Sequence, residues 1–127
     1  MWNIIEDKIL TRWARKVSSK HPLPEYPRPQ LKRKDWKSLN GLWDFAIVDK
    51  NKKSVNNFIG KILVPFPIES ALSGISDTLK PKERLWYRRV LELPSSWEDN
   101  HILLHFGAVD WEATVWVNGE RMGQHRG

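Results

Sequence analysis

The stretch WEATVWVNGERMGQHRG, residues 111–127, decides the fold of this chain. Its first half alternates between apolar and more polar side chains, which is typical of a strand with one face on a core; the apolar members are Trp111, Ala113, Val115 and Val117. Asn118 and Gly119 then form the pair that a two-residue type I′ turn prefers. The stretch predicts a strand over 111–117, a hairpin turn and a returning strand that begins near Glu120.

Shorter runs with strand character occur upstream of this hairpin. They predict strands over 39–48, 61–66, 84–94 and 101–109. In the first of these, Trp43, Phe45 and Ile47 point to one face, and Pro65 ends the second or leaves it at an edge. Several short strands separated by turn signals, with almost no helix, predict an antiparallel β-sandwich.

The first 37 residues differ in composition from the rest. They hold ten Lys and Arg residues against four acidic residues, which accounts for the net charge of +6 of the whole chain. Residues 5–17 have the spacing of a short amphipathic helix, and four prolines within 21–29 keep the next segment extended. We therefore expect a basic, Pro-rich, partly helical arm over 1–37, followed by the sandwich over 38–127.

Composition excludes several classes of site and partner. A chain of 127 residues has the length of a single domain and is too short to contain a catalytic barrel as well. Because it has no cysteine, it can form no disulfide and no thiolate metal site. The histidines lack ligand spacing, so we expect no metal and no cofactor; they are His21, His101, His105 and His125. The chain as given shows no signal peptide or membrane-spanning run, which predicts a cytoplasmic protein by default.

Four blocks of sequence point to a known family. They are YPRPQLKRKDWKSLNGLWDFAI, KILVPFPIESALSGI, LWYRRVLELPSSW and LLHFGAVDWEATVWVNGERMGQHRG. Their order, spacing and aromatic residues resemble the N-terminal sugar-binding domain of family 2 glycoside hydrolases, which include β-galactosidases, β-glucuronidases and β-mannosidases. The resemblance covers residues 26–127 and implies a jelly-roll, galactose-binding-like β-sandwich.

The same resemblance implies which parts the chain lacks. In the family, the HRG sequence is followed by a Gly-Tyr turn and by strands that complete the sandwich, and this chain stops at Gly127. The family also places an immunoglobulin-like domain and a (β/α)8 barrel with two catalytic glutamates after this domain. We therefore expect a C-terminally incomplete fragment of a β-galactosidase-like enzyme, inactive alone, whose parent acts on a β-glycoside or oligosaccharide.

No residue of this chain is expected to be catalytic. Retaining glycoside hydrolysis needs two carboxyl groups about 5 Å apart, and the fifteen acidic residues are scattered along the sequence. The candidate carbohydrate contacts are Glu69, Trp86 and Asp110. Glu69 lies in PFPIESALSGI, whose family counterpart reaches toward the active site of the barrel, although a glutamate that caps a turn is the simpler interpretation.

Most of the eight tryptophans are better used in the core than for stacking on sugars. Trp43 and Trp111 share their strand faces with aliphatic side chains, so we expect both to be structural. Trp86 lies on the less apolar face of its strand and is a candidate for exposure. Arg88 and Arg89 point to opposite faces, so at least one of them is expected to form an ion pair or to stack on an aromatic ring.

The sequence thus favours a non-catalytic domain that packs on a catalytic barrel and helps to wall its active site. Two alternatives remain open at this point. One is an independent carbohydrate-binding module, which needs a finished sandwich and an exposed aromatic platform. The other is nucleic-acid binding by the basic arm, which we do not expect, because the rest of the chain has no RNA-binding sheet motif or helix-turn-helix pattern.

Overall fold

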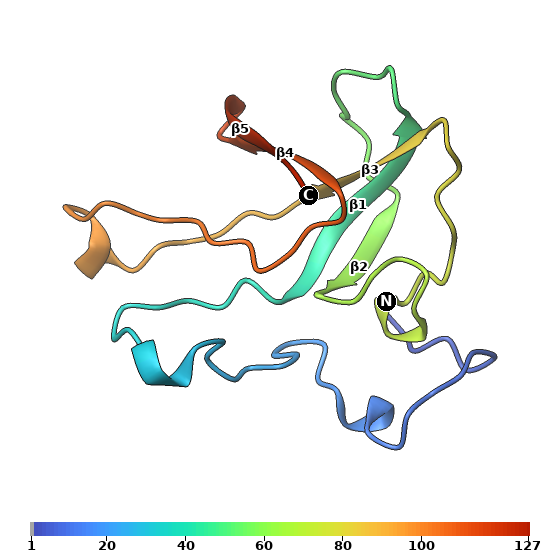
Figure 1. Ribbon diagram of the computed structural model, residues 1–127, viewed down its shortest axis with the longest axis horizontal. Helices are drawn as coiled ribbons and strands as arrows, with labels where there is room; N and C mark the ends of the chain where they lie inside the picture. Colours follow the sequence, from blue (N-terminus) through green and yellow to red (C-terminus); the bar gives the residue numbers. More distant parts are fainter. Residues whose placement is uncertain (1) are drawn as a thin grey trace. The chain divides into compact units, whose positions relative to one another are not determined.

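The structure, a computed structural model that describes residues 2–127, is built of strands, loops and short 3₁₀ turns (Figure 1). The strands are β1 (Gly41–Asp49), β2 (Gly60–Val64), β3 (Glu83–Arg88), β4 (Glu112–Val117) and β5 (Glu120–Arg126). The 3₁₀ turns are η1 (Ala14–Lys16), η2 (Pro29–Leu31), η3 (Ala71–Ser73) and η4 (Ser95–Trp97). All strand pairs are antiparallel, so the expected all-β antiparallel class is confirmed. The jelly-roll topology stays a prediction.

The chain divides into two compact units. The first, Met1–Val90, contains a three-stranded sheet in the order β2-β1-β3, and the second, Leu91–Gly127, contains the two-stranded sheet β4-β5. The packing of one sheet against the other stays a prediction, as does the division into an arm over 1–37 and a sandwich over 38–127.

The core of the first unit lies on one face of its sheet. Phe45 and Ile62 are buried there together with Ile68 from the loop after β2. Five partly buried side chains surround them: Trp43, Ile47, Ile75, Leu79 and Leu85. The predicted apolar face of β1 is therefore confirmed, and the loop after β2 covers it.

The start of β1 is tied to the end of β3 through one carbonyl oxygen. Leu39 O accepts hydrogen bonds from the Trp43 indole Nε1 at 2.8 Å and from the Arg89 guanidinium at 2.7 Å. Gly41 has a φ of 132°, and a Cβ there would lie 3.2 Å from the Arg89 Nη1. This position therefore needs glycine for its backbone angle and for the close approach of the guanidinium.

The other face of the same sheet carries a cross-strand ion cluster. Asp44 contacts Lys61 at 2.5 Å and Arg88 at 3.1 Å, from the two neighbouring strands. The hydrogen bond from Lys61, assisted by Arg88, lowers the pKa of the Asp44 carboxyl. Arg88 also stacks on Phe58, 4.2 Å from the ring centroid. Arg88 and Arg89 are thus both engaged, which agrees with the prediction that at least one of them would be.

The amphipathic helix expected over 5–17 is wrong; the 3₁₀ turn η1 forms there instead. The residues that would form its apolar stripe do not share a buried face, because Ile9 and Trp13 are exposed. The backbone N–H of Ile5 donates to a carbonyl outside the arm, that of Ala71. A helix this short is marginal without a surface that buries its apolar stripe. Residues 21–28 contain several bends and no regular helix or strand.

The hairpin of the second unit matches its prediction. Asn118 and Gly119 have φ values of 51° and 88°, and β4 pairs with β5 on either side of them. The strand expected over 101–109 is wrong, because this segment pairs with no strand of the described chain and its apolar side chains are exposed. Trp111 was expected in a core and is 61% exposed, since it precedes β4 rather than extending it. The strand predicted over 84–94 ends at Arg88.

Replacing Trp43 tests the core of the first unit. Trp43→Ala removes a half-buried indole and leaves the Leu39 carbonyl with one donor fewer, so we expect a loss of about 2–4 kcal/mol in the free energy of unfolding. Urea unfolding followed by circular dichroism measures it. Trp13→Ala is the matched control, because Trp13 is 58% exposed and its loss should cost less than about 0.5 kcal/mol. Equal effects of the two changes would contradict the assignment of the core face.

The exposed apolar segment 101–109 should make the isolated chain self-associate. It contains no proline and no Lys, Arg, Asp or Glu, and its backbone, which belongs to no strand ladder of the described residues, can template pairing with another chain. We expect an apparent mass above that of the monomer in light scattering, lowered by the double change Leu104→Lys and Phe106→Lys. Ile9→Lys is the control, since Ile9 is fully exposed outside this segment. A monomeric wild-type chain would contradict this expectation.

Candidate functional site

The loop between β2 and β3 is a compact structure and not an irregular connection. We call residues 65–79 the Glu69 loop. Its centre is the buried Ser73 hydroxyl, which bonds to the carbonyls of Ile68 (2.9 Å) and Ser70 (2.7 Å) and accepts from the backbone N–H of Ile75 (3.0 Å). Gly74, with a φ of 80°, ends η3 in the left-handed conformation that suits glycine. The loop therefore has a defined shape.

Glu69 lies exposed in this loop, directly after the buried Ile68. The side chain that caps η3 is that of Ser70, which accepts from the backbone N–H of Ser73. Glu69 thus does not cap this turn, and its carboxylate is presented to solvent from a rigid backbone.

Tyr87 interacts electrostatically with Glu69. Tyr87 is 39% exposed, but partial burial of its phenol, with the charge of Glu69 adding to the effect, raises the pKa of Tyr87 to about 12. The Tyr87 ring also meets Trp43 edge to face, with centroids 6.4 Å apart. We call Glu69, Tyr87 and Trp43 the Glu69 patch.

The Glu69 patch has the chemistry of a weak polar contact site. A carboxylate accepts hydrogen bonds from sugar hydroxyls, a phenol both donates and accepts, and an indole edge offers apolar area. It lacks the two carboxyl groups that glycosidic bond cleavage requires. The arrangement can hold or orient a polar ligand, and it does not supply an acid and a nucleophile.

The sequence singled out Glu69 but missed Tyr87 and Ser73. Tyr87 follows Trp86 in β3 and lies opposite the buried Phe45, which places it on the core face. The alternation of the strand gave that face, but nothing local indicated that the Glu69 loop folds back beside it. The Ser-x-x-Ser-Gly spacing of residues 70–74 is the signal that could have revealed the capped turn.

The other two candidates do not join the Glu69 patch. Trp86 lies opposite Ala46 in the register, so it belongs to the other face of the sheet, and it is half-buried. Asp110 belongs to the second unit and lies exposed before Trp111. A role for Glu69, Trp86 or Asp110 in sugar contact stays a prediction.

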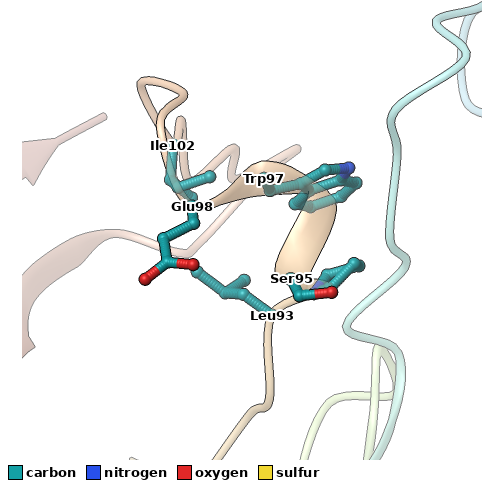
Figure 2. A pocket seen from close by; sticks show the side chains of 6 residues that line it. Leu93, Ser95, Trp97, Glu98 and Ile102 are labelled. Carbon is teal, nitrogen blue, oxygen red and sulfur yellow. The ribbon is translucent and has the colours of Figure 1, made fainter.

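A shallow hollow of about 350 Å³ lies in the second unit (Figure 2). Its walls are Leu93, Pro94, Ser95, Trp97, Glu98 and Ile102. In Figure 2, Glu98, Leu93 and Ile102 gather on one side of η4. Mostly apolar walls with a single carboxylate do not make a catalytic pair, so the hollow is not a candidate active site.

Some carboxylates of the described residues are engaged in ion pairs. Glu6 pairs with Arg15, Asp44 with two cations, and Glu112 with Arg126. Within residues 2–127, no group of three or more His, Asp or Glu side chains is placed to hold a metal ion. The same residues include no helix long and apolar enough to cross a membrane.

Comparison with known proteins finds β-glucuronidases. The β-glucuronidase of Streptococcus agalactiae is 27% identical over 95 residues, which are 70% of this chain and 15% of that protein. The β-glucuronidases of Felis catus and Sus scrofa are each 28% identical, over 119 and 117 residues that make up 80% of this chain and 18% of theirs. No protein-family model matches the chain. The chain thus spans less than a fifth of these relatives, and the similarity supports a relationship to glycoside hydrolases.

The ionisation of Tyr87 tests the geometry of the Glu69 patch. The chain has two tyrosines, so in the Tyr26→Phe variant the ultraviolet absorbance of tyrosinate reports on Tyr87 alone. We expect a midpoint at about pH 12, lowered in part by Glu69→Gln because burial is the larger cause. Since folding disfavours the phenolate, stability should fall as the pH rises from 10 to about 12.

Glu25→Gln is the control for this titration, because Glu25 is an exposed carboxylate of the arm. It should leave the midpoint unchanged. A midpoint of Tyr87 at its ordinary value of 10.0, or one that does not respond to Glu69→Gln, would contradict the patch.

Proposed function

We propose that this chain is the N-terminal, non-catalytic β domain of a family 2 glycoside hydrolase that acts on β-glycosides. The domain packs on an immunoglobulin-like domain and a catalytic barrel, and the Glu69 loop helps to wall the active site of that barrel. The chain alone is inactive in this proposal, because the catalytic carboxylates belong to the barrel.

The similarity to β-glucuronidases is the observation that carries this proposal. It extends over 70–80% of the chain and 15–18% of each relative, which fits one domain of a much longer enzyme. The antiparallel all-β structure and the engaged carboxylates agree with a supporting role. The relatives' name favours a β-glucuronide over the β-galactoside that the sequence suggested.

The shape of the Glu69 loop supports its assignment to the wall of an active site. Ile68 and Ser73 anchor the loop in the sheet and in its own backbone, and Glu69 stands exposed between them. A carboxylate held on a rigid backbone can orient a sugar hydroxyl with little loss of conformational entropy. Glu69 in this role would shape the outermost part of a sugar site whose catalytic groups come from the barrel.

Hydrolysis assays test the proposal. The purified chain should not cleave nitrophenyl β-glucuronide, β-galactoside or β-mannoside above buffer. When the chain is joined to the immunoglobulin-like and barrel domains of its parent, we expect activity on one of these substrates and a roughly tenfold lower kcat/KM for Glu69→Gln, the loss expected for one hydrogen bond to a charged group.

Glu25→Gln in the joined enzyme is the matched control and should leave kcat/KM unchanged. Turnover by the chain alone that disappears when one of its own carboxylates is replaced would overturn the proposal. Tight sugar binding by the chain alone would instead favour an independent carbohydrate-binding module.

A further inference from the structure

The N-terminal residues 2–5 lie against η3, the turn at the centre of the Glu69 loop. In Figure 1 the N-terminal end lies beside this yellow-green turn. The Trp2 indole Nε1 donates to the Leu72 carbonyl at 3.1 Å, and the Ile5 backbone N–H donates to the Ala71 carbonyl at 3.2 Å. Two donors from one end of the chain thus bind two successive carbonyls of η3.

Carbonyl groups at the end of a short turn can accept from donors outside the turn. The last carbonyl groups of a helical turn have few partners within the turn, and a turn of three residues is not stable by itself. The Ala71 carbonyl accepts from Gly74 within the loop at 3.3 Å, and the Leu72 carbonyl receives the Trp2 indole. The Trp2 indole therefore supplies the donor for the Leu72 carbonyl, and Ile5 adds a second donor to the Ala71 carbonyl.

The fit of the indole is close. A Cβ built on Gly74 would lie 2.6 Å from the Trp2 Nε1 and 3.1 Å from the Asn3 carbonyl oxygen, closer than real Cβ atoms normally approach other groups. Gly74 is thus required by its φ of 80° and also by the ring that lies over it. The residues directly after this contact, 6–13, are exposed apart from Leu10, so the contact is a separate docking point of the arm.

We propose that residues 2–5 form a strap that positions the Glu69 loop, with Trp2 as its positioning residue. The strap fixes η3, which carries Ser73, and the Ser73 hydroxyl in turn bonds to the Ile68 carbonyl next to Glu69. Detachment of the strap would loosen the loop and move Glu69 away from Tyr87 without unfolding the sheet. This inference deepens the proposed function, because it concerns the loop assigned to the active-site wall.

Hydrogen exchange with mass spectrometry on the full chain tests the strap without any sugar. Trp2→Ala should increase the exchange rate of the amides of residues 68–76 by about tenfold, the equivalent of one hydrogen bond and part of a buried ring, and leave β1 and β2 unchanged. Trp2→Phe keeps a ring and loses the donor, so it should have a smaller effect. Trp13→Ala, the matched control from the exposed part of the arm, should change neither region.

The titration of Tyr87 supplies a second readout. A variant that is less stable overall but still folded should not change the pKa of Tyr87. In the Tyr26→Phe background, Trp2→Ala should lower the pKa of Tyr87 from about 12, because the Glu69 loop contributes to its surroundings, and Trp13→Ala should not. Unchanged exchange and titration in Trp2→Ala, or faster exchange spread equally over β1, β2 and the loop, would overturn the strap.

Gly74→Ala keeps the test decisive if Trp2→Ala is poorly folded. Its methyl group would occupy the place of the indole and should increase exchange of the same residues. In the Trp2→Ala background the additional effect of Gly74→Ala on exchange should be smaller, since the ring is already absent. Fully additive effects of the two changes on exchange would overturn the contact.

The Glu69→Gln assay in the joined enzyme tests the proposed function separately. A kcat/KM that Glu69→Gln does not lower would reject the proposed function and leave these exchange results unaffected.

Discussion

The packing of Ile68 on Phe45 and Ile62 is the contact on which the first unit depends. A three-stranded sheet with one apolar face has to bury that face against another element. Here the cover is not a helix but the Glu69 loop, which inserts Ile68 into the face and adds Ile75 and Leu79 around it. The same contact that completes the core therefore fixes the backbone on either side of Ile68.

This constraint explains how the loop can be anchored in the core and still present an exposed carboxylate. Ile68 is buried in the core and Ser73 in the turn. The backbone of the exposed Glu69 between them is therefore held in place from both sides. Tyr87 is held in the same way, since its strand neighbour Phe45 is in the core and its ring meets Trp43. Core packing thus also fixes the residues of the Glu69 patch, so holding the patch in place requires little further loss of conformational entropy.

The sequence pattern predicted the structure correctly in two situations. In one, the interacting residues are neighbours in the sequence; in the other, apolar alternation alone determines which face of a strand a residue is on. The alternation of Trp43, Phe45 and Ile47 predicted the core face of β1, and Asn118 with Gly119 predicted the turn between β4 and β5. The same reasoning failed for 101–109, because alternation predicts which face of a strand is apolar but a strand also needs a neighbour to pair with. Trp111 was wrongly expected in a core for the same reason, because its apolar alternation with the residues of β4 does not by itself show burial.

The Glu69 patch was harder to predict because its contacts join distant parts of the sequence. Glu69 was found through the resemblance of its loop. Its electrostatic interaction with Tyr87 joins a loop to a later strand, and nothing in either segment indicates it. Trp2 is separated from Leu72 by 70 positions, and residues 1–37 were expected only to form a basic, Pro-rich arm.

The two units differ in whether their apolar residues are buried, because an apolar sheet face or strand needs another element to cover it. The first unit satisfies its apolar sheet face with a loop of its own, and the end of the arm completes that loop. In the second unit, the apolar residues of 101–109 are exposed and the backbone of that segment is outside any ladder. Backbone pairing and burial of the face normally form together in a strand, so the apolar alternation of 101–109 is by itself not enough to make this segment a strand. The Glu69 loop, in contrast, has both its buried anchor and its hydrogen-bond partners within the first unit.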